Sequence, residues 1–117
     1  MISPVNSTVS ALQAYNSQLQ VTSNNIANVN TDEFKKSKVN LQEGANGGVQ
    51  ANIRRVDTPG YRYQAREGDR MIEKETSNVD LSEELPQLTV TQHAYKANMK
   101  VIQTQDEILG TALNIVG

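Results

Sequence analysis

The sequence contains no cysteine and no tryptophan, and only 4% of its 117 residues are aromatic. The absence of cysteine excludes disulfides, zinc–thiolate sites and thiol catalysis. No more than two apolar residues follow one another anywhere, so the chain offers neither a transmembrane helix nor the apolar region of a signal peptide. We therefore expect no direct membrane insertion, and we expect any export to proceed without a cleaved signal peptide.

Apolar residues are scarce as well, at 37% of the chain, whereas Asn, Gln, Ser and Thr together supply 39 residues. Ordinary soluble domains contain roughly 45–50% apolar residues, glycine included. A large compact core is therefore not expected in a chain of this length. The composition favours one domain or one elongated element, stabilised by long helices that pack on neighbours. It disfavours an enzyme built around a deep pocket.

The charged residues are unevenly distributed. Lys and Arg number 11 against 13 Asp and Glu, so the basic surface of a nucleic-acid-binding protein is missing. Residues 1–30 contain no charged residue, although their pattern is helical, and residues 31–84 hold 20 of the 24 charges. Because a solvated helix normally carries a charged outer face, this helix is suited to lie against other protein. A Ser/Asn/Gln-rich surface helix, or simple disorder, is the alternative interpretation.

Apolar residues recur every seven positions in both terminal segments, with a second row offset by four. This spacing is typical of two helices wound into a left-handed supercoil. It predicts a mainly α fold in which long N- and C-terminal helices form an antiparallel coiled-coil-like hairpin. Two helices have too little mutual surface to bury both stripes, so we expect other copies to cover the rest. The predicted assembly interface consists of Val5, Val9, Leu12, Leu19, Ile26, Leu81, Leu85, Leu88, Tyr95, Met99, Ile102, Leu109 and Leu113.

Between the helical segments the period changes from that of a helix to that of a strand. Residues 49–54 and 61–66 alternate apolar with polar, and Pro59 and Gly60 between them are ordered as in a type II turn. We predict a small antiparallel β insertion, with a third strand at 38–42 or at 70–74. The expected organisation is an N-terminal helical segment at 1–31, a β-hairpin and loop insertion at 32–79, and a C-terminal helical segment at 80–117.

Pro86 constrains the start of the second helix. If Asp80 is the N-cap, Pro86 is the sixth helical residue, where its ring and missing N–H disturb the helix. If Ser82 is the cap, Pro86 is the fourth and nearly harmless. We therefore predict that the helix begins at Ser82 or later, or bends in the turn before Pro86.

No catalytic constellation is visible. The single histidine, His93, has Glu84 about two turns before it and Asp106 more than three turns after it on the predicted helix. Neither a Ser–His–Asp arrangement nor a metal-ligand cluster can be assembled from this spacing. The sequence predicts no enzyme, no cofactor or metal, no small-molecule substrate and no nucleic-acid partner.

Two stretches resemble the bacterial flagellar rod and hook protein family. Residues 23–31, Ser-Asn-Asn-Ile-Ala-Asn-Val-Asn-Thr, followed by Phe34-Lys35, match the N-terminal pattern S-N-N-[LI]-A-N-x-N-T-x-G-[FY]-K. Residues 76–85, 91–98 and 103–109 resemble the C-terminal motif of the same family. The sequence departs from the family at Glu33, where Gly is usual, at His93, where Arg is usual, and at Pro86. The residues that match the rod motif are Asn24, Asn25, Ala27, Asn28, Thr31 and Phe34.

The resemblance implies a structural subunit of the flagellar basal-body rod that self-assembles through its terminal helices and serves motility. It further implies export through the flagellar export apparatus, a place in the periplasm-spanning rod, and partners that are other copies and other rod or hook proteins. The motif asparagines 24, 25 and 28 are expected to hydrogen-bond backbone where the helix ends. A second interpretation is a soluble helical-hairpin adaptor, or assembly chaperone, that binds flagellar axial proteins.

Overall fold

The computed structural model describes residues 4–116, so residues 1–3 and 117 of the expected terminal segments lie outside it. The molecule is elongated, with extents of 81 × 25 × 20 Å and a radius of gyration of 20.9 Å, against about 13 Å for a compact chain of this length. Its elements, in chain order, are α1 (Pro4–Ala27), β1 (Ser37–Glu43), β2 (Val49–Arg55), β3 (Arg62–Glu67), β4 (Arg70–Glu75) and α2 (Leu81–Val116).

The expected fold class, mainly α with one small β insertion, is wrong. Four strands form two separate antiparallel sheets, β1 with β2 and β3 with β4. The strands predicted at 49–54 and 61–66 do not pair with each other, and both proposed third strands exist. The reason lies in the turns. Gly60 does not adopt the positive φ that a type II turn requires, whereas Gly47 and Gly48 (φ 86° and 78°) and Gly68 (φ 64°) reverse the chain within each pair.

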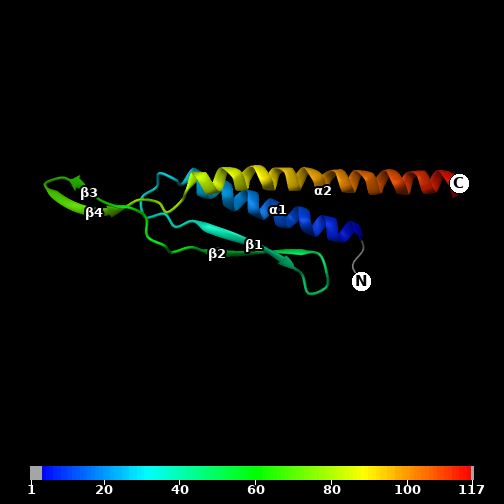
Figure 1. Ribbon diagram of the computed structural model, residues 1–117, viewed down its shortest axis with the longest axis horizontal. Helices are drawn as coiled ribbons and strands as arrows, with labels where there is room; N and C mark the ends of the chain where they lie inside the picture. Colours follow the sequence, from blue (N-terminus) through cyan, green and yellow to red (C-terminus); the bar gives the residue numbers. More distant parts are fainter. Residues whose placement is uncertain (1–3, 117) are drawn as a thin grey trace.

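Helix α1 lies between α2 on one side and the β1–β2 sheet on the other, and the two helices run in opposite directions (Figure 1). The hydroxyl oxygen of Ser10 accepts a 3.0 Å hydrogen bond from the Val49 amide, which fixes one face of α1 on β2. The β3–β4 hairpin projects from the end of the molecule where α1 ends and α2 begins (Figure 1). Within residues 4–116 it packs against no other helix or strand.

The centre of the molecule is polar. In the part of the chain that the structure describes, Ala11 and Ala14 are the only buried apolar residues. The other buried residues on the two helices are Thr8, Gln18, Thr22, Asn25, Glu84 and Thr91. Small and polar side chains allow helices to approach closely, but they contribute little hydrophobic free energy. The pairing of α1 with α2 therefore leaves most of the apolar surface of both helices uncovered.

Helix α2 begins at Leu81 and continues through Pro86 to Val116, so a start at Ser82 or later is wrong. The alternative, a bend in the turn before Pro86, stays a prediction. Asp80 is the N-cap: its Oδ1 accepts a hydrogen bond from the Ser82 amide at 2.9 Å, and its carbonyl accepts from the Glu83 and Glu84 amides. Three satisfied amides at the helix start offset the one helix hydrogen bond that the proline in the second turn cannot make.

Candidate assembly site

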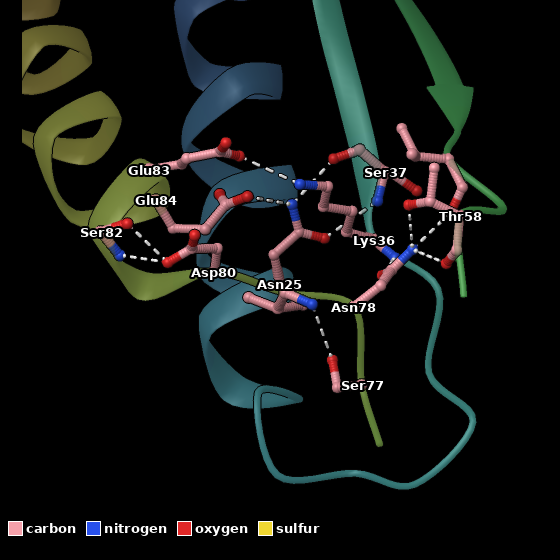
Figure 2. A network of polar contacts seen from close by, with 12 residues as sticks. Asn25, Lys36, Ser37, Thr58, Ser77, Asn78, Asp80, Ser82, Glu83 and Glu84 are labelled. Carbon is pink, nitrogen blue, oxygen red and sulfur yellow. Dashed lines mark hydrogen bonds and ion pairs between the residues drawn. The ribbon is translucent and has the colours of Figure 1, made fainter. Parts of the chain in front are cut away.

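A cluster of polar side chains joins the end of α1, the start of α2 and the bases of both sheets (Figure 2). We call it the polar joint, and it is built on two asparagines, one from each family-like motif. Its members are Asn25, Lys36, Ser37, Thr58, Asn78, Glu83 and Glu84.

Asn25 is the most deeply buried side chain of the joint, with 1% of its surface exposed. Its amide group pairs with the backbone of Ser37 at the start of β1, donating to the carbonyl oxygen at 2.8 Å and accepting from the amide at 3.1 Å. The same Nδ2 donates to Oε1 of Glu84 on α2, at 3.3 Å. One side chain thus fixes α1, β1 and α2 relative to one another.

Asn78 performs the corresponding task for the C-terminal motif. Its Oδ1 accepts a hydrogen bond from the Lys36 amide at 2.7 Å. Its Nδ2 donates to the carbonyl oxygens of Val56 and Thr58, at 2.8 and 2.9 Å. The chain entering β1, the chain leaving β2 and the chain leading to α2 are held by this one amide group. Sequence analysis did not select Asn78, although its place inside the C-terminal motif was a signal that could have identified it.

The projecting hairpin is attached through Glu75 at the end of β4. Its carboxylate pairs with the Lys35 ammonium group and accepts a 2.8 Å hydrogen bond from the Gly60 amide. Its carbonyl oxygen accepts from the Glu33 amide, also at 2.8 Å. Tyr63 adds a 2.6 Å hydrogen bond to the Asp32 carboxylate. The Lys35 and Gly60 hydrogen bonds lower the pKa of Glu75 below its ordinary value.

Acid is therefore expected to loosen the hairpin. A carboxyl group whose pKa is lower in the folded state stabilises that state above its unfolded pKa, and the contribution is lost as the pH falls through the folded pKa. We expect attachment at neutral pH and loosening below about pH 4. The Gly60 amide resonance should follow this titration in an NMR pH series, and the Glu75→Gln variant should abolish the shift. A Gly60 resonance that titrates at the ordinary glutamate pKa would contradict the proposed contact.

Gly60 is also confined sterically. A Cβ atom at this position would lie 2.1 Å from the carbonyl oxygen of Thr76, which is a backbone atom. Gly60→Ala should therefore displace the base of the hairpin and lower the free energy of unfolding by about 1–3 kcal/mol. Gly110→Ala is the reference variant: outside its own stretch of α2, no atom lies within 4 Å of its Cβ position, and alanine in a helix interior should raise the free energy of unfolding by up to roughly 1 kcal/mol. Equal thermal midpoints for the two variants would argue against close packing at Gly60.

The remaining motif residues surround the end of α1. The Asn28 side chain donates to the carbonyl oxygen of Asn24 at 2.9 Å and accepts from the Thr31 hydroxyl at 3.0 Å. Phe34 is half-buried, whereas Ala27 and Thr31 are exposed. These contacts are local to the end of α1. A role of these residues in assembly stays a prediction.

Glu33 adopts φ 63°, a left-handed backbone conformation that favours glycine. It stands where the family pattern has Gly, so the turn keeps the left-handed geometry despite the different residue. Glu33→Gly should raise the free energy of unfolding by about 1 kcal/mol, because a left-handed non-glycine residue costs roughly 1–2 kcal/mol. Glu33→Ala removes the carboxylate but keeps the strain, so chemical denaturation should show no comparable gain. A Gly variant no more stable than the Ala variant would refute this reasoning.

The predicted interface residues lie beside the polar centre of the helix pair. All of them are accessible to some degree. Six are half-buried: Leu12, Leu19, Ile26, Leu88, Tyr95 and Ile102. Seven are exposed: Val5, Val9, Leu81, Leu85, Met99, Leu109 and Leu113. These seven side chains remain exposed in the single chain, so their role as an interface between chains stays a prediction.

Sequence analysis missed the residues at the centre of the helix pair. Those of α2 are polar and also seven apart: Glu84, Thr91, Asn98 and Gln105. This periodicity was visible in the sequence, but polar side chains are normally assigned to the solvent face. Only the packing distinguishes a buried polar row from a solvated one.

Helix α2 extends past α1 (Figure 1). Asn25 contacts Glu84, and antiparallel helices advance equally, so Pro4 lies at about the level of residue 105. Residues 106–116 therefore have no α1 neighbour among the described residues, and all of them are exposed. We call this segment the overhang. Its large apolar side chains are 58–88% exposed: Ile108, Leu109, Leu113, Ile115 and Val116.

A pocket of about 420 Å³ lies between the end of α1, the base of the β1–β2 sheet and the start of α2. Its walls carry Lys36, Lys38 and Arg54 from the sheet side and Glu83 and Glu84 from α2. Among residues 4–116 no cluster of three or more His, Asp or Glu side chains is arranged to hold a metal. No helix of this range combines the length and apolar character needed to cross a membrane.

Comparison with known proteins matches both helices to one family. Residues 6–35 match the family described as flagella basal body rod protein, and residues 74–115 match the flagellar basal body rod FlgEFG protein C-terminal family. Over 41 residues the chain is 51% identical to the flagellar hook protein FlgE of Escherichia coli and to that of Helicobacter pylori. Over the same length it is 49% identical to the flagellar basal-body rod protein FlgG of Borreliella burgdorferi.

The aligned segment is 35% of this chain but only 10%, 6% and 16% of those three relatives. The chain thus matches a small part of much longer curated relatives. Its two matched regions nevertheless coincide with α1 and its following turn, and with the end of β4 and nearly all of α2. The chain belongs to the bacterial flagellar rod and hook protein family, a family of structural proteins of the flagellum.

Proposed function

We propose that this chain is a subunit of the flagellar basal-body rod that assembles with its own copies and with other rod or hook proteins, and that it thereby serves motility. The observation that carries the proposal is the inverted packing of the helix pair. Polar residues occupy its centre, while the apolar rows lie at the flanks and on the overhang.

Apolar surface of this extent is unfavourable in water, because burying it contributes roughly 25 cal/mol of stabilising free energy per Å². Copies packed side by side would cover the flanks of both helices. The uncharged exposed face of α1 supports the same arrangement, because burying it between subunits leaves no charge without a partner. The expected export through the flagellar export apparatus belongs to this proposal and rests on family membership.

The decisive experiment is deletion of the gene, followed by imaging of basal bodies and by fractionation of cells that carry a tagged copy. A rod subunit is expected to co-purify with detergent-extracted basal bodies in several copies, and its loss should shorten or interrupt the rod. An adaptor or chaperone would stay in the cytosol and leave purified basal bodies unchanged in composition, which would overturn the proposal.

A further inference from the structure

Two cations on the β1–β2 sheet have no partner within the described chain. Lys38 and Arg54 stand directly opposite each other in the strand register, and both line the 420 Å³ pocket. Neither makes an ion pair or a side-chain hydrogen bond among residues 4–116, whereas Lys35, Lys36, Arg55 and Arg62 each pair with a carboxylate. Like charges directly opposite each other in paired strands are destabilising. An external anion bound between Lys38 and Arg54 would reduce their repulsion.

The carboxylates of the same pocket do not serve this purpose. Glu83 pairs with Lys36 at 3.0 Å, and Glu84 accepts a hydrogen bond from the Asn25 amide. The pocket also contains apolar side chains, Val21, Val39 and Val56, beside the two free cations. A matching ligand therefore combines a negative charge with an apolar surface.

The overhang carries this combination at the opposite end of the helix pair. Asp106 and Glu107 are the only charged residues of the last 17 positions, and both are acidic. No cation stands three or four positions from either on the helix, and no ion pair with either occurs among the described residues. Beside them lie the exposed side chains of Ile108, Leu109 and Leu113.

We propose that the overhang of one copy docks on the pocket of the next, with Asp106 and Glu107 facing Lys38 and Arg54. The two copies point in the same direction. Asp106 lies 22 positions after Glu84 on α2, which implies an axial offset of about 33 Å at 1.5 Å per residue. This is a heterologous, head-to-tail contact, which propagates rather than closing into a dimer. It rests on the proposed function and specifies which surfaces determine the axial order of subunits.

Charge exchange tests the contact. Lys38→Glu with Arg54→Glu, or Asp106→Lys with Glu107→Lys, is expected to raise the concentration needed for association by about tenfold or more, since close interfacial charge pairs couple strongly. Mixing the two reversed chains should restore association to near the original concentration. Arg66→Glu with Arg70→Glu is the matched control: it changes the net charge equally, on the projecting hairpin, and should have little effect. Sedimentation velocity of the full chain provides the measurement.

Cysteine cross-linking gives an independent readout, because the chain contains no cysteine of its own. A Lys38→Cys chain mixed with an Asp106→Cys chain should yield a heterodimer with a short bismaleimide, whereas Arg66→Cys with Asp106→Cys should not. If the unmodified chain stays monomeric at all concentrations and is absent from basal bodies, the proposed function fails. If it associates, but charge reversal is silent and the Lys38→Cys and Asp106→Cys chains do not cross-link, the head-to-tail contact alone is refuted.

Discussion

Asn25→Leu is expected to be the most destabilising single substitution in this chain. The variant would leave the Ser37 amide and carbonyl groups and the Glu84 carboxylate without the partner that Asn25 provides. A buried polar group without a hydrogen-bond partner lowers the free energy of unfolding by about 1–3 kcal/mol. The substitution would leave several such groups without a partner at once. The expected loss of about 3 kcal/mol or more is a large fraction of the 5–15 kcal/mol typical of a whole domain.

The measurement is urea unfolding followed by circular dichroism, with Asn16→Leu as the control. Asn16 lies on the same helix but is exposed, so its substitution should change the midpoint little. Amide exchange should also show β1 detaching from α1 in the Asn25 variant. Similar midpoints for the two variants would mean that the joint contributes no stability and that its hydrogen bonds are replaced by water without cost.

Charge placed on the outer face of α1 is expected to abolish assembly while leaving the free chain folded. Gln13 and Gln20 are exposed, so Gln13→Glu with Gln20→Glu breaks no contact within the molecule. If this face meets other subunits, each new carboxylate loses its hydration on assembly, which costs several kcal/mol per ion when no cation is provided. We expect an unchanged unfolding midpoint, no incorporation into basal bodies and loss of swimming.

Gln64→Glu on β3 is the control for either single change on α1, because it likewise introduces one carboxylate, at an exposed position outside the helices. It should assemble normally. Normal motility of the Gln13 and Gln20 double variant would show that the uncharged face of α1 is solvated in the cell. The proposed packing of α1 against other subunits would then be abandoned.

The helices were predictable because their determinants are local and periodic. A row of apolar residues at seven-residue spacing predicts a helix wherever it occurs, and the absence of charge before residue 31 is visible without coordinates. The two motifs identified the family for the same reason: their residues are contiguous in the sequence. Even so, the start of α2 was mispredicted. The strength of the Asp80 cap depends on three amides that are brought together only when the turn forms.

The pairing of strands was not predictable, because alternation defines a strand but not its partner. Residues 49–54 alternate equally well whether they pair with β3 or with β1. Glycines 47, 48 and 68 have positive φ values and turn the chain within each observed pair, whereas Gly60 lacks the positive φ that a type II turn between residues 49–54 and 61–66 needs.

The sequence by itself determined the two long helices, the absence of charge on the first of them and the membership of the flagellar rod and hook family. Tertiary structure alone decided which residues those helices bury. Periodicity assigns apolar residues to the contact, but the joint around Asn25 and Asn78 holds α1, α2 and β1 in a rotation that buries Thr22, Glu84 and Thr91 instead. That rotation is set by hydrogen bonds between residues 12 to 59 positions apart, and no local pattern encodes such contacts.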